Sequence, residues 1–495
     1  MLKPLIVKEN WNGGMSLNRR LTNKNQTYKG SGIDPLIVEG YIANKVGLTR
    51  ITLSSVTDIG VEFQDIVYTQ EGSDIYFAGE DTKIYTGEGD LSVANDSGQA
   101  GIIRGLKEYK GYMYYPQDTT IGRSDLAGSP TYTDNWQSSN ISNVAYKPMV
   151  ISSDNSSAGS SLFIGNGQYV AKWDDTTFTY NALDLKAGWE IQCMDNFGSS
   201  LLAIGSNYGT SANSVASKIF LWNKIHPTIW DDEIEVPETK IHAMISRPGG
   251  LWYFAGTNSL SLYFCPLGSR QGIRVWTFQN QNPNSLNVFT VYPNAVSVKD
   301  GRIVFGLSFN TTITDQFKPG IYSFNPDINN LKMLCERETS ATGLVDIKSA
   351  KTVKYLGQPE MIYFSYENGS TQNLYRENLF SSDSSIYSTA GSFTTGVAET
   401  EYFEAPPGKK LYFDGFGLDY LPLSGSATVE LYYMKDTETD YTLIKSTSTT
   451  GVTGFYKTLP IECFSIRFKI ILSATSARGF VKRFYGTGKL IDDTR

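Results

Sequence analysis

One short pattern recurs along this chain: an apolar arm, a turn rich in Gly or Asn, and a second arm that ends in Tyr or Trp. The clearest copies are DIYFAGEDTKIY from residue 74 and GLWYFAGTNSLSLYF from residue 250, and five more start at residues 111, 161, 201, 301 and 360. The first arms run from Tyr76 to Ile362, which is 286 residues over six intervals, or about 48 residues per repeat. This spacing matches the roughly 40 to 50 residues of a four-stranded propeller blade.

The two arms of the copy at residue 250 differ in pattern. The first arm, residues 251–255, is apolar at every position, whereas Leu260, Leu262 and Phe264 of the second arm alternate with Ser261 and Tyr263. A continuously apolar strand must be covered on both faces, as an inner strand is when it lies between neighbouring blades. We therefore predict a β-propeller of about seven blades, within a range of six to eight. A stack of β-sandwiches is the alternative.

A separate prediction concerns the turn of the same hairpin. Gly256 directly follows the first arm. If its backbone requires a positive φ, replacement by Val should cost on the order of 1 to 2 kcal/mol.

Composition agrees with an all-β fold. The chain has 31 Tyr and 25 Phe, which suit a pleated, half-buried surface. Its 46 Gly and 18 Pro are spread along the sequence, as frequent turns between short strands require. No long amphipathic helix is evident in the pattern, so we expect strands to dominate.

A change of amino-acid composition near residues 390 to 408 divides the chain into two parts. The segment STAGSFTTGVAETEYFEAPPGKK combines small polar residues with Pro406, Pro407 and Gly408, as a linker does. We predict three regions: an N-terminal arm with a ring-closing strand at 1–60, the β-propeller at 61–392 and a C-terminal antiparallel β-sandwich at 393–495.

The last region shows clean alternation. In CFSIRFKIIL the residues Phe464, Ile466, Phe468, Ile470 and Leu472 fall on one predicted face, and more polar residues fall on the other. The segment TVELYYMKDTETDYTLIKS reads as a hairpin that turns at DTETD. Both patterns are typical of an antiparallel sandwich.

The N-terminal arm has a Gly-rich, basic opening. It could pack along the ring, supply a strand that closes the ring, or reach a neighbouring subunit. Trp11, Arg19 and Arg20 in this opening are our candidates for contact with a partner.

Charge and hydropathy exclude several classes of protein. The net charge is −7 with a pI near 5.2, and no run of Lys and Arg exceeds two residues, so sequence-specific nucleic-acid binding is not expected. No stretch has the roughly 18 apolar residues that span a bilayer, and the apolar run at the start is too short for a signal-peptide core. We expect a soluble protein made in the cytosol, without membrane insertion.

Catalytic and metal motifs are not found in the sequence. The two histidines, His226 and His242, lie in NKIHPTIWDD and TKIHAMIS, neither of which places a nucleophile in a recognisable elbow. We predict no catalytic residues, no metal and no cofactor, and we expect the chain not to be an enzyme. A glycosidase-type pair of catalytic carboxylates is not excluded by the sequence, because two such groups from different blades leave little local signature.

The four cysteines are far apart and lack CxxC spacing. Each lies in or beside an apolar, strand-like segment. We therefore predict buried free thiols rather than disulfides or metal ligands at Cys193, Cys265, Cys335 and Cys463.

Taken together, these features resemble the propeller-containing structural proteins of tailed-bacteriophage tails, of the nozzle and tail-accessory type. The residues that carry the resemblance are the opening WNGG…LNRR…NQTYKGSGIDP, the tandem YFAG hairpins and the closing SIRFKIILSATSARGFVKRFYGTGKLI. The resemblance implies a non-enzymatic virion protein that is synthesised in the host cytoplasm and repeated around the tail axis as a ring or tube segment. Its partners would be other copies of itself and other tail proteins.

The resemblance also implies passing contact with phage DNA along an exit path. An acidic surface would suit such a conduit, because like charge keeps the duplex from adhering to the wall. A carbohydrate-binding or glycan-cleaving propeller is the main alternative, and a cytosolic scaffold of the WD type is a third.

Overall fold

We analysed a computed structural model of the chain. The structure describes residues 4–9, 29–31, 33–34, 42–44, 48–54, 59–70, 74–98, 101–127, 129–154, 159–209, 214–257, 259–278, 288–311, 318–328, 331, 333–338, 343–354, 360–368, 371–377, 395–400, 402–423, 427–473 and 479–492. Trp11, Arg19 and Arg20, the predicted partner contacts, lie outside these residues.

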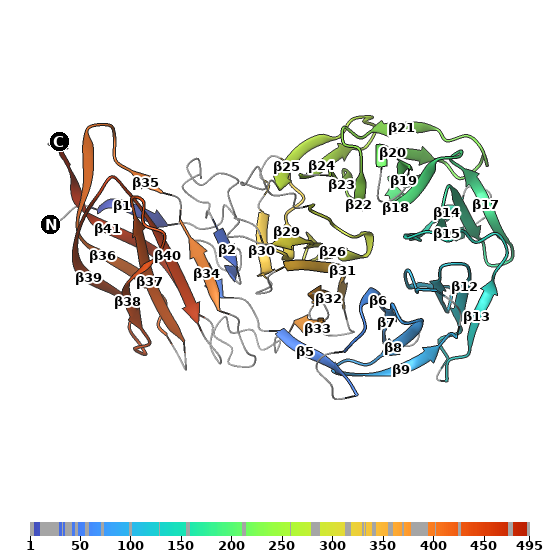
Figure 1. The fold of residues 1–495 in the computed structure, drawn as a ribbon, viewed down its shortest axis with the longest axis horizontal. Coiled ribbons are helices and arrows are strands. Elements are labelled where there is room, and N and C mark those ends of the chain that lie inside the picture. Colours follow the sequence, from blue (N-terminus) through green and yellow to red (C-terminus); the bar gives the residue numbers. More distant parts are fainter. Residues whose placement is uncertain are drawn as a thin grey trace.

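Five antiparallel sheets of four strands follow one another along the chain and lie around a common centre (Figure 1). The first comprises β10 (Lys107–Tyr109), β11 (Tyr112–Pro116), β12 (Ile121–Ser124) and β13 (Tyr132–Gln137). The second comprises β14 (Met149–Asp154), β15 (Gly159–Asn166), β16 (Tyr169–Trp173) and β17 (Phe178–Asp184). The third comprises β18 (Trp189–Phe197), β19 (Leu201–Gly209), β20 (Ser214–Trp222) and β21 (Asp232–Glu235).

The fourth comprises β22 (Ile241–Arg247), β23 (Gly250–Ala255), β24 (Leu260–Pro266) and β25 (Ile273–Phe278). The fifth comprises β26 (Val296–Lys299), β27 (Arg302–Leu307), β29 (Gly320–Phe324) and β30 (Met333–Glu338). A short 3-10 helix, η1 (Pro293–Ala295), precedes β26.

A nine-stranded sheet joins the beginning of this series to its end. Its order is β28-β31-β32-β33-β5-β9-β8-β7-β6, in which β5 pairs antiparallel with β33 and parallel with β9. Its strands are β5 (Leu48–Leu53), β6 (Phe63–Tyr68), β7 (Ile75–Gly79), β8 (Lys83–Thr86), β9 (Asp90–Asp96), β28 (Phe309–Thr311), β31 (Gly343–Val353), β32 (Met361–Asn368) and β33 (Thr371–Glu377). Residues 48–377 therefore form a closed ring, which we call the ring (Figure 1).

All seven hairpins predicted from the repeated pattern are present. They pair β7 with β8, β11 with β12, β15 with β16, β19 with β20, β23 with β24, β27 with β29 and β32 with β33. The fold is all-β, and its four-stranded sheets are those of a propeller-like architecture.

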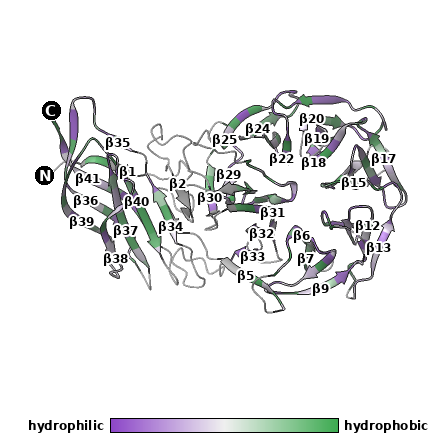
Figure 2. Cartoon of the chain, in the orientation of Figure 1, coloured by the Kyte–Doolittle hydropathy of each residue, from purple (hydrophilic) through white to green (hydrophobic). Residues whose placement is uncertain are grey.

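The hairpin of β23 and β24 shows why its first arm is apolar throughout. All six residues of β23 are buried. Trp252 and Phe254 pack into one apolar cluster with β27 and β29, whereas Leu251 and Tyr253 pack into another with β19 and β20. The strand thus separates two cores, and alternate side chains enter each of them. Outer strands such as β13 and β21 carry more hydrophilic residues (Figure 2).

Two six-stranded sheets contain the C-terminal strands, together with β1 to β4 from the start of the chain. One has the order β3-β4-β41-β36-β39, with β1 paired to β41, and the other has the order β2-β34-β40-β37-β38, with β35 paired to β40. Their strands are β1 (Pro4–Glu9), β2 (Lys29–Ser31), β3 (Ile33–Asp34), β4 (Ile42–Asn44), β34 (Gly396–Glu399), β35 (Phe403–Glu404), β36 (Lys409–Tyr420), β37 (Thr428–Lys435), β38 (Thr442–Thr447), β39 (Gly454–Cys463), β40 (Ser465–Ser473) and β41 (Phe480–Asp492). We call these two sheets the C-terminal unit.

A single apolar cluster draws on both sheets of the C-terminal unit. The rings of Phe468 on β40 and Phe484 on β41 lie with their centroids 4.6 Å apart. Figure 2 shows apolar residues along β34, β37 and β40. The predicted hairpin at DTETD is present between β37 and β38.

One detail of the predicted alternation in this unit is wrong. Ile466, Phe468, Ile470 and Leu472 are buried as expected, but Phe464 is 45% exposed. It precedes the first residue of β40, so the strand register does not carry its side chain to the apolar face.

Candidate functional site

Two adjoining hollows lie at the centre of the ring, and together we call them the central cavity. They have volumes of about 270 and about 710 Å³ and share the wall residues Lys107, Ile151 and Lys351. Between them they touch the first strand of each four-stranded sheet, namely β10, β14, β18, β22 and β26, and also β6 and β31 of the nine-stranded sheet. Only a position on the ring axis can meet all of these strands.

Asp65 on β6 and Asp195 on β18 lie in the wall of the cavity in equivalent ways. Each carboxylate accepts a hydrogen bond from the next residue of its own strand, at 2.9 Å for Asp65 and 2.7 Å for Asp195. The second oxygen of Asp65 accepts the N–H of Leu106 at 2.9 Å, and that of Asp195 accepts the N–H of Ser246 at 2.7 Å. Both acceptors therefore fasten one innermost strand to a neighbouring sheet.

Lysines supply the positive charge of the cavity. Lys351 forms an ion pair of 3.4 Å with Asp65. The side chain of Lys107 has no hydrogen bond or ion pair to any residue that the structure describes, and Lys107 lines both hollows. Burial lowers the pKa of Lys107, and the neighbouring charge of Lys351 lowers it further, whereas the charges of Asp65 and Asp195 act in the opposite direction. Burial also raises the pKa of Asp195.

Helix η1 closes one side of the cavity. Pro293 and Asn294 belong to its wall, and the amide of Asn294 donates to the carbonyl oxygens of Gln64 at 2.9 Å and Arg104 at 3.1 Å. The two carbonyls come from segments of the first sheets of the ring, whereas Asn294 precedes β26. The chain thus crosses the axis of the ring at this point.

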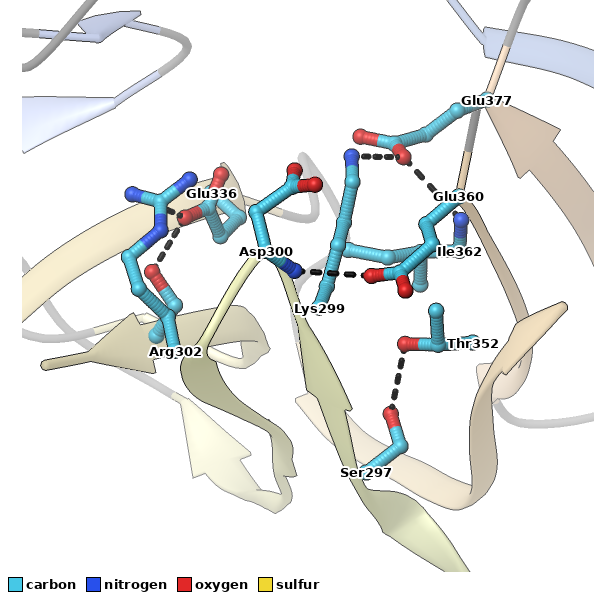
Figure 3. A network of polar contacts seen from close by, with 10 residues as sticks. Ser297, Lys299, Asp300, Arg302, Glu336, Thr352, Glu360, Ile362 and Glu377 are labelled. Carbon is cyan, nitrogen blue, oxygen red and sulfur yellow. Dashed lines mark hydrogen bonds and ion pairs between the residues drawn. The ribbon is translucent and has the colours of Figure 1, made fainter. Parts of the chain in front are cut away.

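A second polar network lies between the sheet of β26 and strands β31 to β33 (Figure 3). Glu377 accepts the N–H of Ile362 at 3.0 Å and forms an ion pair of 2.5 Å with Lys299. Arg302 lies 3.3 Å from Glu336. Lys299 on β26 and Glu377 on β33 join two sheets, whereas Arg302 and Glu336 pair within one sheet.

The histidines and cysteines are placed as follows. Cys193, Cys265, Cys335 and Cys463 are all buried and free, as predicted. Burial raises the pKa of Cys265 to about 11, which keeps this thiol protonated at neutral pH. His226 is exposed, whereas His242 is buried and its Nε2 lies 2.7 Å from the carbonyl oxygen of Gly256.

No group of three or more His, Cys, Asp or Glu side chains with metal-binding geometry occurs in the described part of the chain. No helix among the residues described is long and apolar enough to cross a membrane. The central cavity is therefore the site whose chemistry we consider further. No local sequence motif marks it, because Lys107 and Lys351 lie in ordinary strand patterns and meet only through closure of the ring.

Comparison with known proteins yields likeness of architecture alone. No family model and no curated sequence matches the chain. Among solved structures, the virginiamycin B lyase of Staphylococcus aureus in a catalytically inactive form matches 68% of this chain and 100% of its own, with 12% identity and a TM-score of 0.41. The extracellular domain of a hybrid two-component system from B. thetaiotaomicron covers 80% of this chain and is matched over 44% of its own, with 9% identity and a TM-score of 0.46.

Raptor from Chaetomium thermophilum is similar over 68% of this chain and 28% of its own length, with 11% identity and a TM-score of 0.43. These three proteins differ widely in what they do, and at such identities and scores the likeness says nothing of the activity of this chain.

Proposed function

We propose that this chain is a non-enzymatic structural protein of a tailed-bacteriophage virion, repeated around the tail axis as a segment of the nozzle or an accessory ring. The proposal rests on the resemblance of its opening and closing sequences to such proteins. The observation that best supports it is the double closure of the molecule. Strand β5 completes the ring, and β1 to β4 pair within the C-terminal unit, so both parts are suited to a load-bearing role.

The proposal includes a finer reading of the fold. We take the nine-stranded sheet as two blades joined edge to edge, which gives seven blades with the five separate sheets. We take the C-terminal unit as a β-sandwich, because one apolar cluster lies between its two sheets. The regions 1–60, 61–392 and 393–495 then correspond to arm, propeller and sandwich, with the arm shared between the other two.

The path of DNA would run outside the ring of any single chain. Asn294 bridges the axis of the ring, and the hollows there are far too small for a duplex. In this proposal the lumen is formed by several copies around the tail axis, which one repeated heterologous interface can generate. The net charge of −7 suits such a lumen.

Electron microscopy of the purified chain and of virions tests the proposal. We expect closed rings of the purified chain at high concentration, and peptides of this chain in purified virions by mass spectrometry. A monomer at all concentrations, together with its absence from virions, would overturn it. Saturable binding on a glycan array would instead favour the carbohydrate-binding alternative.

A further inference from the structure

We propose that the central cavity binds a small oxyanion, a phosphate or carboxylate group carried by a small molecule, held chiefly by the ammonium group of Lys107. The site does not depend on the proposed role in a virion. Its tests use the purified chain, so failure of one proposal leaves the other standing.

Lysines and carboxylates both line the cavity. Four lysines line it, and three carboxylates do. The lysines are Lys107, Lys110, Lys351 and Lys354, and the carboxylates are Asp65, Glu108 and Asp195. Lys110 is paired with Asp175 outside the cavity, so the other three lysines equal the three carboxylates in number.

The carboxylates of the cavity already accept hydrogen bonds from backbone N–H groups of the protein. Both oxygens of Asp65 and both of Asp195 accept backbone N–H groups at 2.7 to 2.9 Å. Glu108 accepts the N–H of Gln70 at 2.7 Å. These bonds stabilise the charged carboxylates in place and leave little capacity to hold a metal ion.

The lysines divide into engaged and available groups. Lys110 forms an ion pair of 3.3 Å with Asp175, and Lys351 forms one with Asp65. Lys107 and Lys354 have no such partner among the residues that the structure describes. Lys107 lies where both hollows meet, near the positive charge of Lys351 and the negative charges of Asp65 and Asp195. Both oxygens of each carboxylate accept backbone N–H groups, whereas an oxyanion beside Lys107 would accept charge-assisted hydrogen bonds from its ammonium group.

The size of the cavity fits a small ligand. The larger hollow, of about 710 Å³, falls in the range that small-molecule sites occupy, and the smaller, of about 270 Å³, lies just below that range. The wall also contains neutral polar groups, among them Tyr68, Gln70 and Thr352. Lysine acts as a point charge and does not select planar groups as arginine does, so both phosphate and carboxylate suit the site.

Isothermal titration calorimetry with inorganic phosphate and with succinate, each against sodium chloride at matched ionic strength, tests the proposal. We expect saturable binding of at least one of the two anions. The variant Lys107→Gln should weaken it about tenfold or more, because a hydrogen bond to a charged group is lost. Lys107→Arg, which keeps the charge, should bind within about threefold of the wild type.

Lys457→Gln is the matched control, since Lys457 is exposed on β39 of the C-terminal unit and its loss removes the same charge. It should leave anion binding unchanged. If Lys107→Gln fails to fold, Lys354→Gln at the exposed rim of the cavity provides the second test, with weaker binding expected.

A second readout is proton uptake. An anion beside Lys107 should return its lowered pKa toward the ordinary value. Binding at alkaline pH should therefore take up protons, seen as heats that differ between buffers of different ionisation enthalpy. Phosphate binding without succinate binding would identify a phosphoryl group, and the reverse would identify a carboxylate. No binding of either anion beyond that of chloride, or equal binding by the wild type and Lys107→Gln, would overturn the proposal.

Discussion

Gly256 shows how one residue controls the geometry of a hairpin. Its φ is +143°, and a Cβ atom added there would lie 1.8 Å from the carbonyl oxygen of Ser259. Its N–H donates to the carbonyl of Lys240 at 2.8 Å, and its own carbonyl oxygen accepts from His242. Replacement therefore disturbs both the β23–β24 turn and its contact with β22.

We expect Gly256→Val to lower the free energy of unfolding by about 2 kcal/mol or more, since a clash with backbone adds to the strain of positive φ. Chemical denaturation measures the change. Gly268→Val is the matched control, because Gly268 also has a positive φ, of +80°, but open space at its Cβ position. Equal losses in the two variants would show that the clash at Gly256 relaxes without cost.

His242 gives the molecule a specific response to acid. Burial lowers its pKa to about 4, and the nearby charge of Lys240 acts in the same direction. Below about pH 6.5 the unfolded chain binds a proton at this residue and the folded chain does not, so stability falls as pH falls from 6.5 toward 4. The loss should reach about 3 kcal/mol.

Urea denaturation at about pH 7 and about pH 4.5 measures this loss. The variant His242→Gln should show less acid destabilisation than the wild type. His226→Gln should keep the full effect, because His226 is exposed. An unaltered pH dependence in His242→Gln would assign the acid response to other groups.

At the scale of elements, the short strand β5 is important for closure of the ring. It connects β33 to β9, and Ile51 at its centre is fully buried with Leu374 and Val353 in one apolar cluster. We expect Ile51→Ala to cost about 3 kcal/mol, as cavity-forming substitutions do. Val93→Ala on neighbouring β9 should change stability by less than about 0.5 kcal/mol, because Val93 is 50% exposed. Similar values in thermal or urea unfolding would mean that β5 is only loosely attached.

The elements also show how far the sequence could predict the structure. The hairpins could be predicted because both arms and the turn lie close together in the sequence, as in GLWYFAGTNSLSLYF. Phe464 was misplaced because alternation does not mark where a strand begins. The central cavity could not be predicted at all. Lys107 and Lys351 become neighbours only when distant strands meet on one axis, and neither carries a local motif.

At the scale of the whole molecule, the first strand belongs with the last. Strand β1 pairs with β41, and Ile6 enters the apolar cluster of the C-terminal unit. Deletion of residues 1–9 should leave residues 483–487 of β41 unpaired on the edge away from β36, while β4 still pairs with Phe480 and Val481. We expect faster hydrogen exchange at the amides of β41 that face β1, measured by mass spectrometry, with the amides of β23 unchanged. Unchanged exchange in β41 would show that its pairing with β36 suffices.

The position of β5 also has a consequence for how the chain is made. About 320 residues separate the end of β5 from the end of β33, its partner. At roughly 5 to 20 residues per second, a ribosome needs on the order of 15 to 65 seconds to deliver that partner. Throughout this interval an open strand edge can associate with other nascent chains. Slow translation or crowded polysomes should therefore increase aggregation of this protein during its synthesis, before the stability of the folded chain has any effect.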